Sequence, residues 1–265
     1  MKIVYVSTSK KNFYQRTLIS EFVLLNNCVP ISPFMNFDYN LSGLVNKDYI
    51  RISNNSLIHK SNELWVFGEL SDGVVVEIYL AKKAGLVVKY FEFNNSSGEQ
   101  IKQINDNEVT LDDVSQWMWE WVISGKNLAR WHPRLRFTKS YPLTYTAYSK
   151  HNFYWQMHIS KFCIENKRTP LNPFMLFKYF LSDKIPRDLV YKANERVIEM
   201  CDSLWVFGEV ADGVYKEVLH NEKNGKETRF YTINDDKYPV TFRRISRSKA
   251  TLENELINQL GTNKI

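Results

Sequence analysis

The most regular hydrophobic feature of the chain is a short apolar run that ends in glycine, and it occurs twice. Residues 64–68 read Leu-Trp-Val-Phe-Gly, and residues 204–208 repeat them at an offset of 140. So short a run of β-forming residues predicts a strand covered on both faces of a sheet. An Asp-Gly pair and a helical apolar pattern follow each run, so we predict a tight turn and a helix capped by the aspartate. These pairs are Asp72, Gly73, Asp212 and Gly213.

The same offset aligns residues 3–93 with residues 143–233 without a gap. Each copy shows a first strand, a helix opened by Asn-Phe-Tyr, a short strand with a Pro-containing exit loop, a second helix, the glycine-turn unit and a last strand. This alternation predicts an α/β fold with a parallel sheet in each copy. The charges in residues 225–233 indicate that the last strand of the second copy is an exposed edge. The Phe34-Met35 pair and its counterpart either roof a ligand pocket or fill the core.

The repeat divides the chain into residues 1–113, a linker at 114–142, and residues 143–265. The linker holds Trp117, Trp119, Trp121 and Trp131 among basic residues. We favour the interpretation that this linker joins the two repeats by burying its indole rings against them. A nucleic-acid surface stays open as a less favoured one. A basic cluster near the end, Arg243, Arg244, Arg247 and Lys249, is interpreted as a solvated helix face.

Composition narrows the class of protein. The 265 residues are 44% hydrophobic with a net charge of +6, which is enough for real cores and permits an anionic partner. Three distant cysteines predict neither a disulfide framework nor a zinc site. No apolar run is long enough to span a bilayer, so we expect a soluble, cytoplasmic protein without a membrane partner. The histidines show no metal-ligand spacing, and nucleotide-cofactor motifs are lacking, so no metal or cofactor is predicted.

Carboxylates are the remaining candidates for chemistry. Each repeat places three of them around the strand–turn–helix corner: Glu69, Asp72 and Glu77, and then Glu209, Asp212 and Glu217. Such groups can attack an anomeric carbon or protonate a leaving group, and a helix N-terminus would keep the last one ionised. The alternative is structural, with the aspartate as a cap and the second glutamate as a surface residue.

The second copy reads Cys-Asp-Ser-Leu-Trp-Val-Phe-Gly at residues 201–208, and the first continues with Ser71, Gly73, Glu77-Ile78, Ala81 and Gly85. This pattern resembles the nucleoside 2-deoxyribosyltransferase-like superfamily, and most closely its uncharacterised phage and plasmid members. The resemblance implies flavodoxin/Rossmann-like parallel sheets with helices on both faces. It also implies that Glu77 and Glu217 attack C1′ of a nucleoside. Because a partner subunit completes such sites, the duplication implies a pseudo-dimer within one chain, and a higher oligomer stays possible.

The sequence departs from the transferase pattern where Ser71 and Ala211 replace an aspartate and where Tyr79 and Leu219 replace a glycine. Two functions are therefore carried forward. The first is an enzyme acting on an N-glycosidic bond of a nucleoside or nucleotide. The second is a non-catalytic protein of phage type that sequesters a nucleotide-like ligand and so interferes with a host pathway. Candidate ligand-binding residues are Ser7, Ser9, Gly68, Glu69, Asp72, Gly73, Tyr148, Ser149, Gly208, Glu209, Asp212 and Gly213. A third possibility is an interaction module built on the linker.

Overall fold

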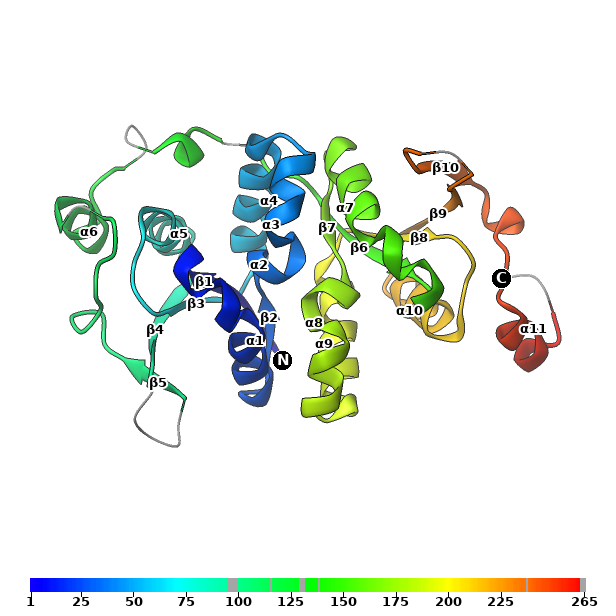
Figure 1. Cartoon of the computed structure of the whole chain (residues 1–265), viewed down its shortest axis with the longest axis horizontal. Helices are drawn as coiled ribbons and strands as arrows, with labels where there is room; N and C mark the ends of the chain where they lie inside the picture. The colour runs from blue at the N-terminus through cyan, green and yellow to red at the C-terminus, as the bar shows by residue number, and fades with distance from the viewer. Residues whose placement is uncertain (95–99, 115, 129–131, 138, 237, 263–265) are drawn as a thin grey trace.

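The chain folds into two α/β units that stand side by side, each built on a five-stranded sheet (Figure 1). The computed structural model describes residues 1–94, 100–114, 116–128, 132–137, 139–236 and 238–262. The first sheet has the order β2-β1-β3-β4-β5 and the second has the order β7-β6-β8-β9-β10. The strands are β1 (Lys2–Thr8), β2 (Cys28–Ile31), β3 (Glu63–Phe67), β4 (Val87–Phe93), β5 (Ile101–Ile104), β6 (Leu143–Tyr148), β7 (Thr169–Leu171), β8 (Ser203–Phe207), β9 (Glu227–Asn234) and β10 (Thr241–Ile245).

Four strands of each sheet run parallel, as predicted, but the fifth does not. β5 pairs antiparallel with β4, and β10 pairs antiparallel with β9. The prediction that residues 225–233 form an edge was therefore wrong, because β10 covers that side of β9. Arg243 and Arg244 lie on this added strand, so the predicted helix face was wrong for them. Arg247 and Lys249 are exposed on the 3₁₀ helix η4.

Helices connect the strands and cover both faces of each sheet. The α-helices are α1 (Arg16–Leu25), α2 (Pro33–Asn36), α3 (Asp38–Leu44), α4 (Lys47–Lys60), α5 (Asp72–Lys83), α6 (Gln116–Ile123), α7 (Gln156–Glu165), α8 (Pro173–Lys184), α9 (Arg187–Met200), α10 (Asp212–Lys223) and α11 (Asn254–Leu260), and the 3₁₀ helices are η1 (Lys10–Gln15), η2 (Pro133–Arg136), η3 (Lys150–Trp155) and η4 (Arg247–Lys249). The predicted exit loops are wrong, because Pro33 and Pro173 begin helices. Proline fits there since the first helical N–H has no partner to lose.

The glycine-turn strands are covered on both faces, as predicted. In β3, Leu64 and Val66 face one cluster of apolar side chains, and Trp65 and Phe67 face another. All four residues are buried, which is the environment that a continuous apolar run favours in a parallel sheet. Gly68 follows with a φ of +73°, a conformation that only glycine adopts readily.

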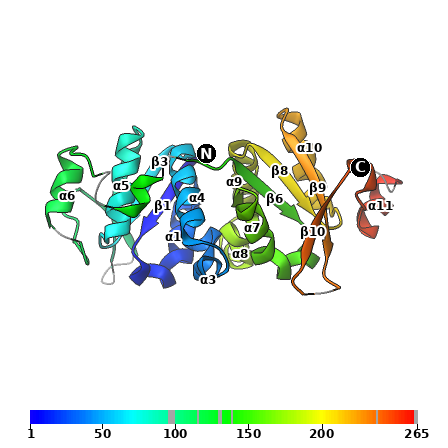
Figure 2. The same ribbon diagram turned by 90° about the horizontal axis from the view of Figure 1, so that it is seen from above.

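The tryptophan-rich segment packs on the first unit. Its helix α6 lies against α5 at one end of the molecule, while α11 lies at the opposite end (Figure 2). Trp119 is buried and Trp117 is 41% exposed, whereas Trp131 lies outside the described residues. A bridge from Leu70 to Leu111 leads into α6, and a bridge from Val210 to Leu252 leads into α11, so the two helices take related places.

The two units meet through the edge strands β2 and β7. Helix α4 of the first unit packs against β7, and helix α9 of the second unit packs against β2. This reciprocal arrangement is that of a pseudo-dimer within one chain. It also shields two edges that would otherwise be open to pairing with other chains. Over the described ranges, no helix has the length and apolar character to cross a bilayer.

Candidate functional site

A cavity of about 420 Å³ opens at the carboxyl ends of β6 and β8 in the second unit. Aromatic and apolar side chains form much of its wall, and the first turn of α10 forms another part. Glu217, Asn194 and Asp212 supply polar groups. The remaining lining residues are Tyr148, Ser149, Lys150, Pro173, Phe174, Phe177, Lys178, Val190, Tyr191, Ala211, Gly213, Val214, Glu253 and Glu255. An apolar hollow with a few convergent polar groups at this edge of an α/β sheet is typical of a small-molecule site.

Only one carboxylate oxygen of Glu217, Oε1, is hydrogen-bonded among the described residues. Tyr145 Oη lies 2.5 Å from Glu217 Oε1, and Asn194 Nδ2 donates to the same oxygen at 3.0 Å. Over the described residues, the other carboxylate oxygen, Oε2, makes no hydrogen bond or ion pair. Because Glu217 lines the cavity, this oxygen is the group that the second unit offers to a ligand.

Burial raises the pKa of Glu217 to about 7, although the hydrogen bonds from Tyr145 and Asn194 act in the opposite direction. The expectation that the helix N-terminus keeps this group ionised was therefore wrong. Glu217 is the sixth residue of α10, beyond the first turn in which the dipole is strongest. Tyr145 Oη also lies 2.9 Å from Asn194 Oδ1, so its single proton can serve either partner. The network can therefore accommodate both protonation states of Glu217.

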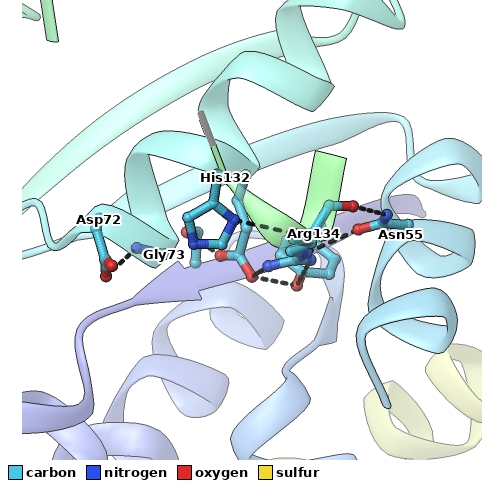
Figure 3. Close-up of polar contacts among 8 residues, drawn as sticks. Asn55, Asp72, Gly73, His132 and Arg134 are labelled. Carbon is cyan, nitrogen blue, oxygen red and sulfur yellow. Dashed lines mark hydrogen bonds and ion pairs between the residues drawn. The ribbon is translucent and has the colours of Figure 1, made fainter. Parts of the chain in front are cut away.

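Glu77, the equivalent residue of the first unit, forms an ion pair with an arginine from the linker. Arg134 Nη1 lies 2.7 Å from Glu77 Oε1, and both side chains are buried. Arg134 Nε donates to Asn55 Oδ1 at 2.7 Å, and the Arg134 amide donates to His132 Nδ1 at 3.2 Å (Figure 3). Burial alone would lower the pKa of Arg134, but the ion pair with Glu77 outweighs it and raises the pKa.

The remaining acceptor positions of Glu77 are also used. Tyr5 Oη donates to Oε1 at 2.7 Å, and Ser7 Oγ donates to Oε2 at 2.5 Å. Ala147 replaces Ser7 in the second unit, which removes the donor to the second oxygen. The first-unit cavity is smaller, about 270 Å³, and is lined by Ser9, Asp72, Gly73 and Glu77 among others. The two glutamates are thus equivalent in sequence, but only Glu217 has an unbonded oxygen toward its cavity.

The structure brings most of the predicted site residues to these two cavities. Tyr148, Ser149, Asp212, Gly213 and Glu217 line the larger one, whereas Ser9, Asp72, Gly73 and Glu77 line the smaller one and Ser7 contacts Glu77. Among the described residues, the walls of the two cavities do not include Gly68, Glu69, Gly208 or Glu209, and both of these glutamates are exposed.

The predicted aspartate caps were wrong. Ser71 and Ala211 hold the N-cap positions, and Asp72 and Asp212 are the first residues of α5 and α10. Asp212 instead pairs with Lys216 at 2.7 Å, one helical turn further on. For the Phe34-Met35 pair and its counterpart, both predicted roles are found. Phe34 and Phe174 line the cavities, whereas Met35 and Met175 are buried in the core.

The partners of the two glutamates were not predicted from the sequence. Tyr5 and Tyr145 lie inside buried strands, and Asn194 and Arg134 come from α9 and η2. One signal was present for the tyrosines, since Tyr5 matches Tyr145 at the 140-residue offset. A polar residue repeated within an apolar pattern marks a buried hydrogen bond. No comparable signal marks Arg134.

Among known families, a model described as a domain of unknown function, DUF7768, matches residues 144–231. This match lies within the second unit, from β6 to β9, and includes Glu217. No curated protein and no solved structure matches the chain.

Proposed function

We propose that the protein acts on the N-glycosidic bond of a nucleoside or nucleotide bound in the Glu217 cavity. The observation that carries this proposal is the carboxylate of Glu217, which is anchored through Oε1 and unbonded at Oε2 beside a largely apolar cavity. The aromatic side chains Tyr148, Phe174 and Tyr191 supply surfaces on which a base can stack. The resemblance to nucleoside deoxyribosyltransferases supports the same assignment.

In the proposed reaction, ionised Glu217 attacks C1′ through Oε2 while the bond from C1′ to the base nitrogen breaks. The electron pair of that bond leaves with the base, which takes a proton from solvent. Water or a second base then attacks C1′ and releases the glutamate. Tyr145 and Asn194 orient the nucleophile through Oε1. Asp212, which is paired with Lys216, is positioned to accept a hydrogen bond from a sugar hydroxyl.

Glu77 takes no part in this proposal, because Arg134, Tyr5 and Ser7 bond both of its oxygens. Placing the reaction in the second unit agrees with the position of the family match, residues 144–231. The linker likewise has a role in the fold, since it supplies the buried Arg134 and Trp119. We therefore do not assign the function to a nucleic-acid surface on the linker.

One observation favours the alternative of a ligand-sequestering protein. With a pKa of about 7, Glu217 is protonated in a substantial fraction of molecules at neutral pH. A protonated carboxyl donates a hydrogen bond and does not attack carbon. In that case the cavity would hold a nucleotide-like ligand without turnover, as suits a protein that interferes with a host pathway.

The test is to incubate the protein with deoxynucleosides, ribonucleosides, nucleotides and NAD, and to follow free base by chromatography and mass spectrometry. Glu217→Gln removes the nucleophile and keeps the shape, so base release should disappear. Glu195→Gln, an exposed change on α9 beside Asn194, is the matched control and should retain activity. Release that persists in Glu217→Gln would overturn the assignment. Retention of one compound on the wild-type protein without base release would establish the binding protein instead.

A further inference from the structure

A second cavity of the second unit, of about 390 Å³, lies away from Glu217. We call it the Trp205 cavity. Trp205 is the middle residue of β8 and packs in the apolar cluster on one face of the sheet, whereas Tyr145, which bonds Glu217, packs in the cluster on the other face. Arginines and aromatic rings dominate its lining, which comprises Phe162, Asn166, Arg168, Trp205, Arg229, Tyr231, Phe242 and Arg244.

The charge of the Trp205 cavity is strongly positive. Arg168 and Arg229 lie over the Trp205 ring, at 5.9 Å and 5.4 Å from its centroid. Glu227 is the carboxylate that the described residues place against the arginines, pairing with Arg229 at 2.7 Å and with Arg244 at 3.6 Å. Three guanidinium groups therefore face one carboxylate, which leaves an excess of two positive charges.

The indole N–H of Trp205 is a buried donor without a partner. The side chain is only 2% exposed, and across the described residues its Nε1 has no hydrogen bond. Such a group is costly in a folded protein, and it calls for an acceptor that the described residues do not supply. An acceptor that entered the cavity and reached Nε1 would satisfy it.

The first unit shows what that acceptor is. At the equivalent position Trp65 Nε1 donates to Glu63 Oε2 at 2.7 Å. Lys2 and Lys89 complete the surroundings of this carboxylate, at 2.5 Å and 2.9 Å. Burial would raise the pKa of Glu63, but the hydrogen bonds from these three donors lower it to about 2. An anion thus sits stably on the tryptophan N–H of the first unit, between two cations.

The second unit keeps the tryptophan and one of the two cations but lacks the carboxylate at this position, and Pro142 stands where the first unit has Lys2. Ser203 stands where the first unit has Glu63, and its Oγ lies 3.2 Å from Thr144 Oγ1. Arg229 takes the place of Lys89, since each lies opposite its tryptophan on the neighbouring strand. Glu227 comes from a different position, matched by Val87, and it does not reach Trp205 Nε1.

We propose that the Trp205 cavity binds the phosphate group of a small molecule, which takes the place that Glu63 fills in the first unit. The phosphate accepts a hydrogen bond from Trp205 Nε1 and pairs with Arg168, Arg229 and Arg244. The excess of two positive charges matches a phosphate dianion, and the guanidinium fork suits its geometry. This site is independent of the function proposed for Glu217.

The experiment follows the indole N–H resonances of ¹⁵N-labelled protein, with the Trp205 signal assigned by loss in Trp205→Phe. Titration with inorganic phosphate and with phenyl phosphate should shift this signal to saturation and leave that of Trp65 unchanged. Arg168→Ala and Arg244→Ala should each weaken binding about tenfold, because each removes a charge-assisted hydrogen bond. Arg243→Ala is the matched control, since its neighbouring position on β10 faces the other side of the sheet.

Ser203→Glu supplies the missing carboxylate. It should shift the Trp205 signal without any ligand and abolish the response to phosphate. A signal that does not respond to phosphate, or that responds equally to sodium chloride at the same ionic strength, would overturn the site. An equal response in the Arg168→Ala/Arg244→Ala double variant would do the same. A stronger response to acetate than to phosphate would overturn the choice of phosphate.

Discussion

The same glutamate has opposite surroundings in the two units. Glu77 receives a guanidinium, a phenol and a serine hydroxyl, so its charge is compensated within the protein. Glu217 receives only a phenol and an amide, and no cation among the described residues forms an ion pair with it. A buried carboxylate without a cation takes up a proton more easily. The replacement of Ser7 by Ala147 and the absence, among the described residues, of a contact like that of Arg134 thus separate a fully paired carboxylate from one with an unbonded oxygen.

The raised pKa of Glu217 predicts a pH dependence of stability. The folded pKa is about 7 and the ordinary value is 4.5, so between these values the folded state holds a proton that the unfolded state has lost. Stability should therefore fall as pH rises through this window, by on the order of 2 kcal/mol. Glu217→Gln cannot titrate and should lack this contribution.

Urea denaturation of the wild type and Glu217→Gln at about pH 5 and about pH 8 measures the difference. The variant should gain stability relative to the wild type at the higher pH. Glu195→Gln, at an exposed position, should follow the wild type at both values. A constant difference between wild type and Glu217→Gln would contradict the raised pKa.

At the scale of elements, the glycine that follows each apolar strand cannot be replaced by a larger residue, because an asparagine side chain lies where a Cβ would be. Gly208 has a φ of +78°, and a Cβ there would lie 2.5 Å from Asn152 Nδ2. Gly208→Ala should lower the free energy of unfolding by more than about 1 kcal/mol, through strain and this clash. Gly213 is the matched control, since a Cβ there meets nothing within 4 Å. Thermal denaturation of Gly213→Ala should show no loss, and an equal loss in both variants would contradict this account.

The elements that sequence analysis found are those whose signal is local. The glycine-turn strand, the helix after it and the helix before it each carry their own pattern, and the 140-residue repeat supplied each pattern twice. Nine of the ligand-binding and catalytic candidates line the two cavities, and Ser7 contacts Glu77, because all of them lie at or after the carboxyl ends of neighbouring parallel strands. The nine are Ser9, Asp72, Gly73, Glu77, Tyr148, Ser149, Asp212, Gly213 and Glu217.

The features that were missed depend on distant contacts. β10 carries Arg243 and Arg244 and lacks an alternating apolar pattern, so only its pairing with β9 identifies it as a strand. Arg134 lies 57 residues from Glu77, and the path of the linker alone brings them together. The cap was misplaced by one residue because Asp72 and Ser71 are both acceptable N-caps, and the choice depends on where the backbone turns.

At the scale of the whole molecule, the contact between the units is part of the fold and not an optional association. Each unit leaves a short edge strand, β2 or β7, that the other unit covers. Asn36 shows how one unit depends on the other, because its buried side chain forms hydrogen bonds with the backbone of the second unit. Its Nδ2 donates to Pro170 O at 2.8 Å, and its Oδ1 accepts from the Asn172 amide at 3.3 Å.

Asn36→Ala should therefore destabilise the chain by about 2 kcal/mol or more, since two buried backbone groups lose their partner at once. Asn26→Ala is the matched control. Asn26 Nδ2 also donates to a carbonyl, Phe22 O at 2.8 Å, but at an exposed helix end where water can replace it. Urea denaturation should show a loss of less than about 0.5 kcal/mol for this control. Equal losses in the two variants would mean that the interface does not depend on Asn36. A single transition at lower urea for Asn36→Ala would show that the two units unfold together, as expected when each covers the other's edge strand.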